Sequence, residues 1–245
     1  MRKILATTAF VWLWLGGAMA MAATPDASSP QLTTPEPDET AAAAPVYTVT
    51  ATAASNYVFR GVSQSADHGA IFGMGRVAFS GFYAGVGAES VDFHTSTKAE
   101  YDLSAGWAPV VDGFRFDLGV VRYGYIDQPS HTDIDTVELK AVVLHDFGPA
   151  TLGAAVFWSG NYFGSHKDDV YVEGRGAYKL TPRWTVSGAV GRQSGGLSDH
   201  TTWNAGATYA ITRHVGLDLR YADTDQHSLG KTYRSQFIAA IKASF

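Results

Sequence analysis

Charged residues within alternating segments are the residues of this 245-residue chain best placed to do chemistry. Many stand two residues apart with opposite sign, as Arg115 with Asp117 and Asp218 with Arg220, which puts both members on one face of an extended strand. The full set is Arg76, Glu89, Glu100, Asp102, Arg115, Asp117, Glu138, Lys140, Glu173, Arg175, Lys179, Asp218, Arg220, Arg234 and Lys242. With eight basic and seven acidic members, such a surface attracts polar solutes without strong selection for either ion sign.

Histidines form a second group, because one falls in each long polar connection. They are His68, His94, His131, His166, His200 and His227. If these connections converge, a His/Asp cluster would bind a divalent cation or change its charge near pH 6. The chain has no His-x-x-x-His spacing, however, and solvated loops are the favoured interpretation. We predict no metal ion and no cofactor.

Motifs for enzymatic chemistry are missing from the sequence. There is no Gly-x-Ser-x-Gly, no phosphate-binding loop and no cysteine. A lipid hydrolase with a Ser-His dyad would need His145 or His214, and neither has a serine and an acidic or amide partner nearby in sequence. The sequence therefore predicts that the protein is not an enzyme.

The segments that must position the charged residues are strands, because their residues alternate between apolar and polar with a period of two. Most segments are close to the ~9–11 residues that a tilted strand needs to cross a bilayer. The twelve predicted strands are 47–59, 70–80, 82–91, 99–108, 114–125, 135–146, 150–159, 169–180, 183–193, 201–211, 214–223 and 232–245.

The connections between these strands alternate between long and short. Long connections such as 61–69 and 126–134 are followed by short ones such as 109–113 and 147–149. Outer-membrane barrels have this asymmetry, with long loops outside and short turns in the periplasm. An even number of strands places both termini in the periplasm.

The apolar face of the pattern carries aromatic residues near strand ends and small or branched residues between them, as Tyr101 and Trp107 flank Leu103 and Ala105. This arrangement is typical of a lipid-facing band between interfacial girdles. Alternation alone also fits a soluble β-sandwich, whose apolar face is its core. The two ends of the chain decide between these interpretations.

The N-terminus has the features of a signal peptide, and the C-terminus ends on an aromatic strand. Arg2 and Lys3 precede an apolar run and an Ala-x-Ala cleavage pattern, so residues 1–22 are predicted to be removed. Residues 23–45 are poor in large apolar side chains and are predicted to be a disordered periplasmic linker. Residues 46–245 form the predicted barrel, and its last strand, ending at Phe245, is the expected signal for the barrel-assembly machinery.

One stretch also resembles a known family. The most specific motif is Ser55-Asn56-Tyr57-Val58-Phe59-Arg60-Gly61-Val62-Ser63-Gln64-Ser65. It resembles the opening of the TorF-like porin family of bacterial outer-membrane β-barrel proteins, and the resemblance is clear over residues 47–125 and looser beyond. Gly69 stands where that family usually has a proline. The resemblance implies an outer-membrane channel and brings neither catalytic residues nor a named solute.

Together these observations predict an all-β, antiparallel up-and-down transmembrane barrel of about twelve strands in the bacterial outer membrane. Its expected function is a porin-like channel for passive diffusion of small hydrophilic solutes, with the charged set lining the pore. The alternative is a structural, adhesive or lipid-modifying barrel whose lumen is closed by its own salt bridges. The net charge of −5, without a basic run, argues against a nucleic-acid partner.

Overall fold

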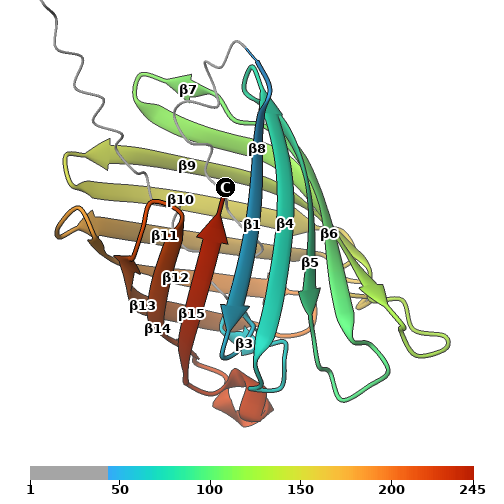
Figure 1. Ribbon diagram of the computed structural model, residues 1–245. Coiled ribbons are helices and arrows are strands. Elements are labelled where there is room, and N and C mark those ends of the chain that lie inside the picture. The colour runs from blue at the N-terminus through green and yellow to red at the C-terminus, as the bar shows by residue number, and fades with distance from the viewer. Residues whose placement is uncertain (1–43) are drawn as a thin grey trace, which may run out of the picture.

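The computed structural model describes residues 44–245 of the chain. Residues 1–43, which include the predicted signal peptide and most of the predicted linker, lie outside the described residues. Within the described part, twelve long strands form one antiparallel sheet that closes into a barrel, because β6 pairs with both β5 and β8 (Figure 1). The predicted fold class is confirmed.

The strands of the barrel wall have 9 to 13 residues each. They are β1 (Val46–Ala54), β4 (Ala70–Phe79), β5 (Phe82–Ser90), β6 (Ala99–Trp107), β8 (Phe114–Ile126), β9 (Thr136–Phe147), β10 (Ala150–Ser159), β11 (Asp169–Lys179), β12 (Trp184–Gly195), β13 (His200–Ala210), β14 (Val215–Thr224) and β15 (Gln236–Ser244). The short elements are β2 (Val58–Phe59), β3 (Val62–Ser63), β7 (Val110–Val111) and the 3₁₀ helices η2 (His227–Leu229) and η3 (Lys231–Tyr233).

Side chains alternate between the lumen and the outer surface along each wall strand. In β9, Glu138 and Lys140 are buried on the luminal side, whereas Val137 and Leu139 on the outer side are 49% and 53% exposed. Apolar side chains that are half exposed around a closed barrel form the surface that faces lipid. Within residues 44–245, no helix is long and apolar enough to span a membrane.

Tight turns connect the strands at one end of the barrel. Ser80 and Gly81 join β4 to β5, and Asp112 and Gly113 join β7 to β8, all with φ between 51° and 81°. Two consecutive positive φ angles define a type I′ turn, whose twist matches that of the flanking strands. The longer connections, such as residues 91–98 and 160–168, lie at the opposite end.

The first and last strands close the barrel wall. β1 pairs with β15 in a register that sets Thr50 opposite Ser244, and Val49 and Phe245 exchange two backbone hydrogen bonds of 2.9 Å. The last strand begins at Gln236 rather than at the predicted residue 232, because η2 and η3 occupy the preceding segment. Arg234 is consequently exposed and lies outside β15, which corrects its predicted position on the inner wall.

Candidate functional site in the barrel lumen

Residues 55–69, which we call the luminal hairpin, leave the wall between β1 and β4 and fold into the barrel. The predicted first strand continues to residue 59, but β1 ends at Ala54 and the next residues pair with each other as β2 and β3. Arg60 and Gly61 form the tip, with φ of 48° and 80°. A Cβ atom at Gly61 would lie 2.4 Å from Thr202 Oγ1, so only glycine allows this close approach.

The hairpin crosses the lumen from the β1 wall to the opposite wall. In the closed order of twelve strands, β10 lies opposite β1. The Arg60 guanidinium donates two hydrogen bonds to the Glu138 carboxylate, of 2.9 and 2.7 Å, and one of 3.2 Å to Gln193 Oε1. Its Cζ atom lies 5.0 Å from the centroid of the Phe157 ring and 4.4 Å from that of Tyr171. Arg60 therefore anchors the hairpin on β9, β10, β11 and β12.

The anchor is a buried ion pair. Burial by itself lowers the pKa of the Arg60 guanidinium, but the Glu138 carboxylate outweighs this effect and holds the pKa above its usual value. The side chains of Arg60 and Glu138 are 2% and 1% exposed, so neither charge has water as an alternative partner. His200 Nε2 lies 3.0 Å from the Arg60 carbonyl oxygen and fixes the backbone of the tip. A bidentate pair of this kind combines strength with a defined geometry.

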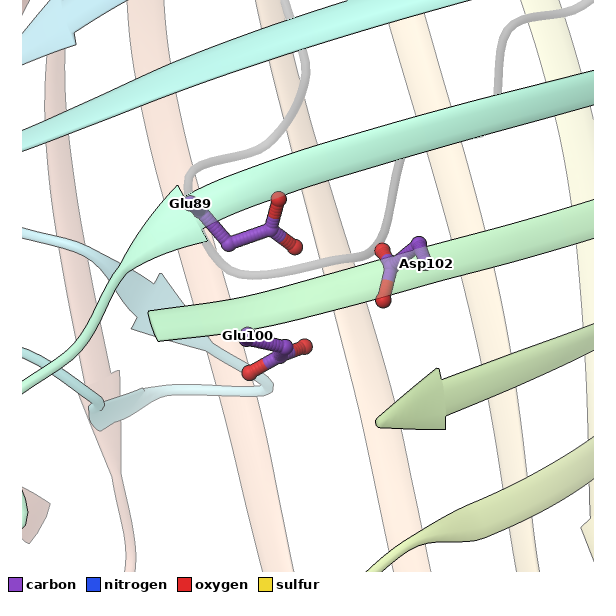
Figure 2. Close-up of side chains that lie close together, drawn as sticks. All are labelled: Glu89, Glu100 and Asp102. Carbon is purple, nitrogen blue, oxygen red and sulfur yellow. The ribbon is translucent and has the colours of Figure 1, made fainter. Parts of the chain in front are cut away.

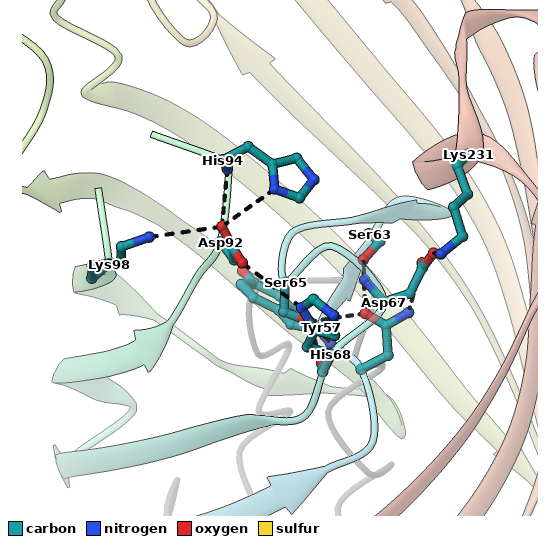
Figure 3. Close-up of polar contacts among 10 residues, drawn as sticks. Tyr57, Ser63, Ser65, Asp67, His68, Asp92, His94, Lys98 and Lys231 are labelled. Atoms are coloured by element: carbon teal, nitrogen blue, oxygen red, sulfur yellow. Dashed lines mark hydrogen bonds and ion pairs between the residues drawn. The ribbon is translucent and has the colours of Figure 1, made fainter. Parts of the chain in front are cut away.

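The base of the luminal hairpin is held by its own hydroxyl groups and by two distant elements (Figure 3). The Tyr57 N–H donates to Ser65 Oγ, and the Asp67 N–H donates to Ser63 Oγ, each at 2.9 Å. Lys231 Nζ in η3 lies 2.9 Å from Asp67 Oδ2. The Asn56 side chain donates to Gln236 Oε1 in β15. The hairpin therefore contacts β15, which forms the seam with β1, and the loop that precedes β15.

The connection between β5 and β6 touches the hairpin through Asp92. The Asp92 N–H donates to the Gln64 carbonyl oxygen at 2.8 Å, and the Nδ1 atoms of His68 and His94 lie 3.7 and 3.8 Å from its carboxylate (Figure 3). The His94 N–H, followed by the nearby Lys98, lowers the pKa of the Asp92 carboxyl.

The remaining loop histidines of the sequence pattern do not join this contact. His227 Nε2 lies 2.6 Å from Asp223, and His200 bonds to Arg60. His68 and His94 therefore share Asp92, whereas His200 and His227 have other partners, so these four histidines do not form one cluster.

Three carboxylates face one another below the hairpin, and we call them the carboxylate cluster (Figure 2). Glu89 of β5 pairs in register with Glu100 of β6, and Asp102 is two residues further along β6. One oxygen from each lies within 4.8 Å of the others. Tyr57 of the hairpin donates to Glu100 at 3.3 Å. An all-oxygen set of this kind suits a hard cation or an ammonium group.

Another luminal carboxylate, Asp117, has both a basic and a hydroxyl partner. Asp117 accepts from Lys140 Nζ at 2.7 Å and from the Tyr83 hydroxyl at 2.7 Å. Within the carboxylate cluster, Asp102 Oδ1 is buried and has no hydrogen-bond partner among residues 44–245.

The charged pairs predicted from sequence are partly realised. Asp218 pairs with Arg220 at 3.1 Å, and Glu173 pairs with Arg175. Arg115 instead pairs with Asp146, Asp117 with Lys140, and Glu138 with Arg60. Cross-strand and hairpin partners thus replace two of the four predicted same-strand pairs.

The other predicted lining residues take different positions. Lys242 is partly buried on the luminal face of β15, and Arg76 is buried on that of β4, with its Cζ atom 3.8 Å from the Tyr83 ring centroid. Lys179 is exposed at the turn end of β11. Arg122 does not belong to the predicted set: it shares the outward parity of Leu118 and Val120 in β8 and pairs with Asp135 at 2.6 Å near the loop end of that strand.

The two histidines considered for catalysis are held by backbone and aromatic contacts. His145 Nδ1 lies 3.1 Å from the Gly113 carbonyl oxygen, and its ring stacks on Phe114 at 4.3 Å. His214 Nδ1 lies 2.8 Å from the Ser244 carbonyl oxygen, and its ring stacks on Phe245. Over residues 44–245, neither imidazole has a serine hydroxyl as a hydrogen-bond partner, so neither forms a Ser-His dyad.

Comparisons with known proteins give a family and a fold. The model of a family described as bacterial protein of unknown function, Gcw_chp, matches residues 39–245. The search of curated proteins gives no match. A solved structure of the KdgM porin in complex with disordered oligogalacturonate is similar, with a TM-score of 0.56 and 11% identity over 82% of this chain and 99% of that chain. A structure of the NanC porin has a TM-score of 0.54 and 12% identity over 82% and 99%. At these identities, the likeness shows a shared porin-like barrel fold.

Proposed function

Since the chain belongs to the Gcw_chp family of bacterial proteins, whose function is unknown, we propose its function from the barrel itself: a narrow outer-membrane channel for passive diffusion of small hydrophilic solutes. The observation that carries this proposal is a lumen lined by charged side chains and crossed by a hairpin anchored at Arg60. The porin-like fold and the resemblance to TorF-like porins support the same assignment.

The luminal hairpin acts as the constriction of this channel. It spans the lumen near the loop end, where Arg60 reaches the third residue of β9. Solutes pass beside it, along walls that carry Arg76, Lys140, Arg220 and the carboxylate cluster. Because basic and acidic groups are both present, the channel selects weakly between anions and cations.

The orientation of the barrel follows from its connections. Both β1 and β15 have their free ends on the side of the tight turns. In outer-membrane barrels this side is periplasmic, so we place residues 44–45 and Phe245 in the periplasm and the luminal hairpin towards the cell exterior. The predicted signal peptide at residues 1–22 and periplasmic linker at residues 23–45 agree with this orientation.

Purified protein in a planar lipid bilayer is expected to give single-channel currents of small conductance with weak ion selectivity. The hairpin crosses the lumen and should narrow the path of a solute, and the predicted lining residues are eight basic and seven acidic, so their charges nearly balance. Reversal potentials in asymmetric KCl measure the selectivity. A complete lack of conductance at every applied voltage would remove the channel proposal.

A second candidate function is a closed structural barrel, and the buried luminal ion pairs favour it. Asp117, Glu138 and Lys140 are all at most 6% exposed; Asp117 and Lys140 pair with each other, and Glu138 pairs with Arg60 of the hairpin. Such a barrel resists heat and blocks solute entry. Liposome swelling separates the two functions, because uptake of a small sugar or glycerol occurs only through a channel.

The C-terminal residue is expected to be required for assembly, since we propose that the last strand is recognised by the barrel-assembly machinery. Deleting Phe245 removes two backbone hydrogen bonds to Val49 and the ring stacked on His214. Outer-membrane fractions should then contain several-fold less barrel that shows heat-modifiable migration on gels. Lys242→Ser, which keeps the strand length and the terminal ring, serves as the control, and equal loss in both variants would contradict a specific role for Phe245.

A further inference from the structure

The guanidinium group of Arg60 lies among aromatic rings of the barrel wall. Its Cζ atom is 4.4 Å from the ring centroid of Tyr171, 5.0 Å from that of Phe157 and 5.9 Å from that of Tyr162. These rings belong to β11, to β10 and to the connection between the two strands. The faces of aromatic rings attract cations, and several rings around one cation are a means of recognising organic cations.

Polar side chains of the wall complete this surrounding. Glu138 and Gln193 accept hydrogen bonds from the guanidinium, and the Gln193 amide in turn donates to Asp169. A carboxylate placed for a bidentate contact fits a planar guanidinium better than it fits an ammonium group. We call the wall residues the arginine cage; each is at most 7% exposed, and they are Glu138, Phe157, Tyr162, Asp169, Tyr171 and Gln193.

The Arg60 side chain does not satisfy the arginine cage completely. Arg60 Nε and Asp169 Oδ1 are both buried, and neither atom has a hydrogen-bond partner among residues 44–245. Buried polar atoms without a partner are costly. The cage therefore has hydrogen-bonding capacity that its present occupant leaves unused.

The hairpin that carries Arg60 has a strained backbone. Arg60, Ala66 and Asp67 have φ angles of 48°, 53° and 63°, which side-chain-bearing residues rarely adopt. Only two register pairs join β2 to β3. Strained residues persist where surrounding contacts hold them, and they are common at ligand clamps and switches. At the tip, those contacts include the bonds of Arg60 to Glu138, so a competitor for Glu138 weakens the hold on the tip.

We propose that the arginine cage is a recognition site for small guanidinium solutes, and that Arg60 is its built-in occupant. A solute with a guanidinium group takes the place of the Arg60 side chain, and the hairpin tip then leaves the opposite wall and widens the constriction. Because solute and side chain compete for the same contacts, binding of the solute favours the displaced conformation. The inference rests on the proposed channel, in which the hairpin is the constriction.

Arg60→Ala tests the recognition, because it empties the arginine cage. Isothermal titration calorimetry on the purified barrel compares ethylguanidinium, which matches the end of an arginine side chain, with ethylammonium, which has the same charge but no planar fork. Arg60→Ala is expected to bind ethylguanidinium roughly tenfold or more tightly than ethylammonium, because the fork makes an additional charge-assisted hydrogen bond. The unmodified protein should bind ethylguanidinium more weakly than Arg60→Ala does, since its own side chain competes.

Two further variants make the binding test specific. Arg60→Ala combined with Glu138→Gln should lose the preference for ethylguanidinium. Arg183→Ala, which removes an exposed arginine from the turn before β12, should bind as the unmodified protein does. If Arg60→Ala does not fold by itself, refolding it in millimolar ethylguanidinium should restore the heat-modifiable form, whereas ethylammonium should not.

Planar-bilayer recordings test the displacement on the unmodified protein. Ethylguanidinium should raise the single-channel conductance above that in the same concentration of ethylammonium. Equal conductance in the two salts, equal affinity of Arg60→Ala for the two cations, or equal refolding in both would overturn the inference. A conducting barrel without this binding contradicts the cage alone. A barrel whose Arg60→Ala form prefers ethylguanidinium but which never conducts contradicts the channel and the widening, and leaves the recognition site in place.

Discussion

Replacing residues 55–69 with a two-residue Asn-Gly turn is expected to raise the single-channel conductance several-fold. Ala54 and Ala70 are register partners at the ends of β1 and β4, so a type I′ turn joins them without disturbing the wall. The change removes the luminal hairpin that crosses the barrel between β1 and the wall of β9 to β12. Planar-bilayer recordings of both proteins at the same salt concentration measure the effect.

The matched control shortens a loop that does not cross the lumen. Replacing residues 129–132, at the exposed tip between β8 and β9, with Asn-Gly removes loop residues but leaves the hairpin in place. Its conductance should equal that of the unmodified protein. If the hairpin replacement also leaves conductance unchanged, the constriction lies elsewhere in the lumen.

Glu138→Gln is expected to destabilise the folded barrel by about 3–5 kcal/mol, the cost of leaving a buried charge without its partner. The Arg60 guanidinium is 2% exposed and makes two of its hydrogen bonds to this carboxylate. The Tyr123 hydroxyl also donates to Glu138 at 3.2 Å. Urea denaturation in detergent micelles, followed by tryptophan fluorescence, measures the loss.

Removing both charges together is expected to restore part of that stability. The double variant Arg60→Met with Glu138→Gln leaves no unpaired buried charge at this site, so it should be more stable than Glu138→Gln alone. Asp146→Asn is the control, because the Arg115–Asp146 pair is partly exposed and such pairs contribute about 1 kcal/mol or less. A loss for Glu138→Gln no larger than that of the control would show that Arg60 is not the anchor.

The barrel wall could be predicted from the sequence because its signal is local. A strand of the wall can be recognised from an alternation of apolar and polar residues with a period of two. This alternation recurs in each of the wall strands, so the prediction does not depend on any single segment. The turns at Gly81 and Gly113 are also encoded by two adjacent residues. The same alternation predicts that the charged residues of the wall point inward. The structure buries most of them on the luminal side, among them Arg76, Glu100 and Lys140.

The luminal hairpin was not predictable in the same way. Residues 55–59 are as β-prone as the strand before them, and β2 does form, but its partner is β3 in the same loop. What bends the segment inward is the contact of Arg60 with Glu138 and Gln193, which lie 78 and 133 residues away in sequence. The carboxylate cluster was missed for a similar reason. The strand register sets Glu89 opposite Glu100, and neither strand's own sequence indicates which residue of the neighbouring strand will lie opposite.

The contacts of the luminal hairpin join residues that are far apart in sequence, which bears on the order in which the barrel folds. Its contacts with Gln193, His200 and Gln236 span 133, 140 and 180 residues, and contacts of such separation form late because the intervening chain must be ordered first. β1 has the same dependence, since β15 is its partner. We therefore expect both the insertion of the hairpin and the closure of the seam to come late in assembly, after most of the wall strands have paired.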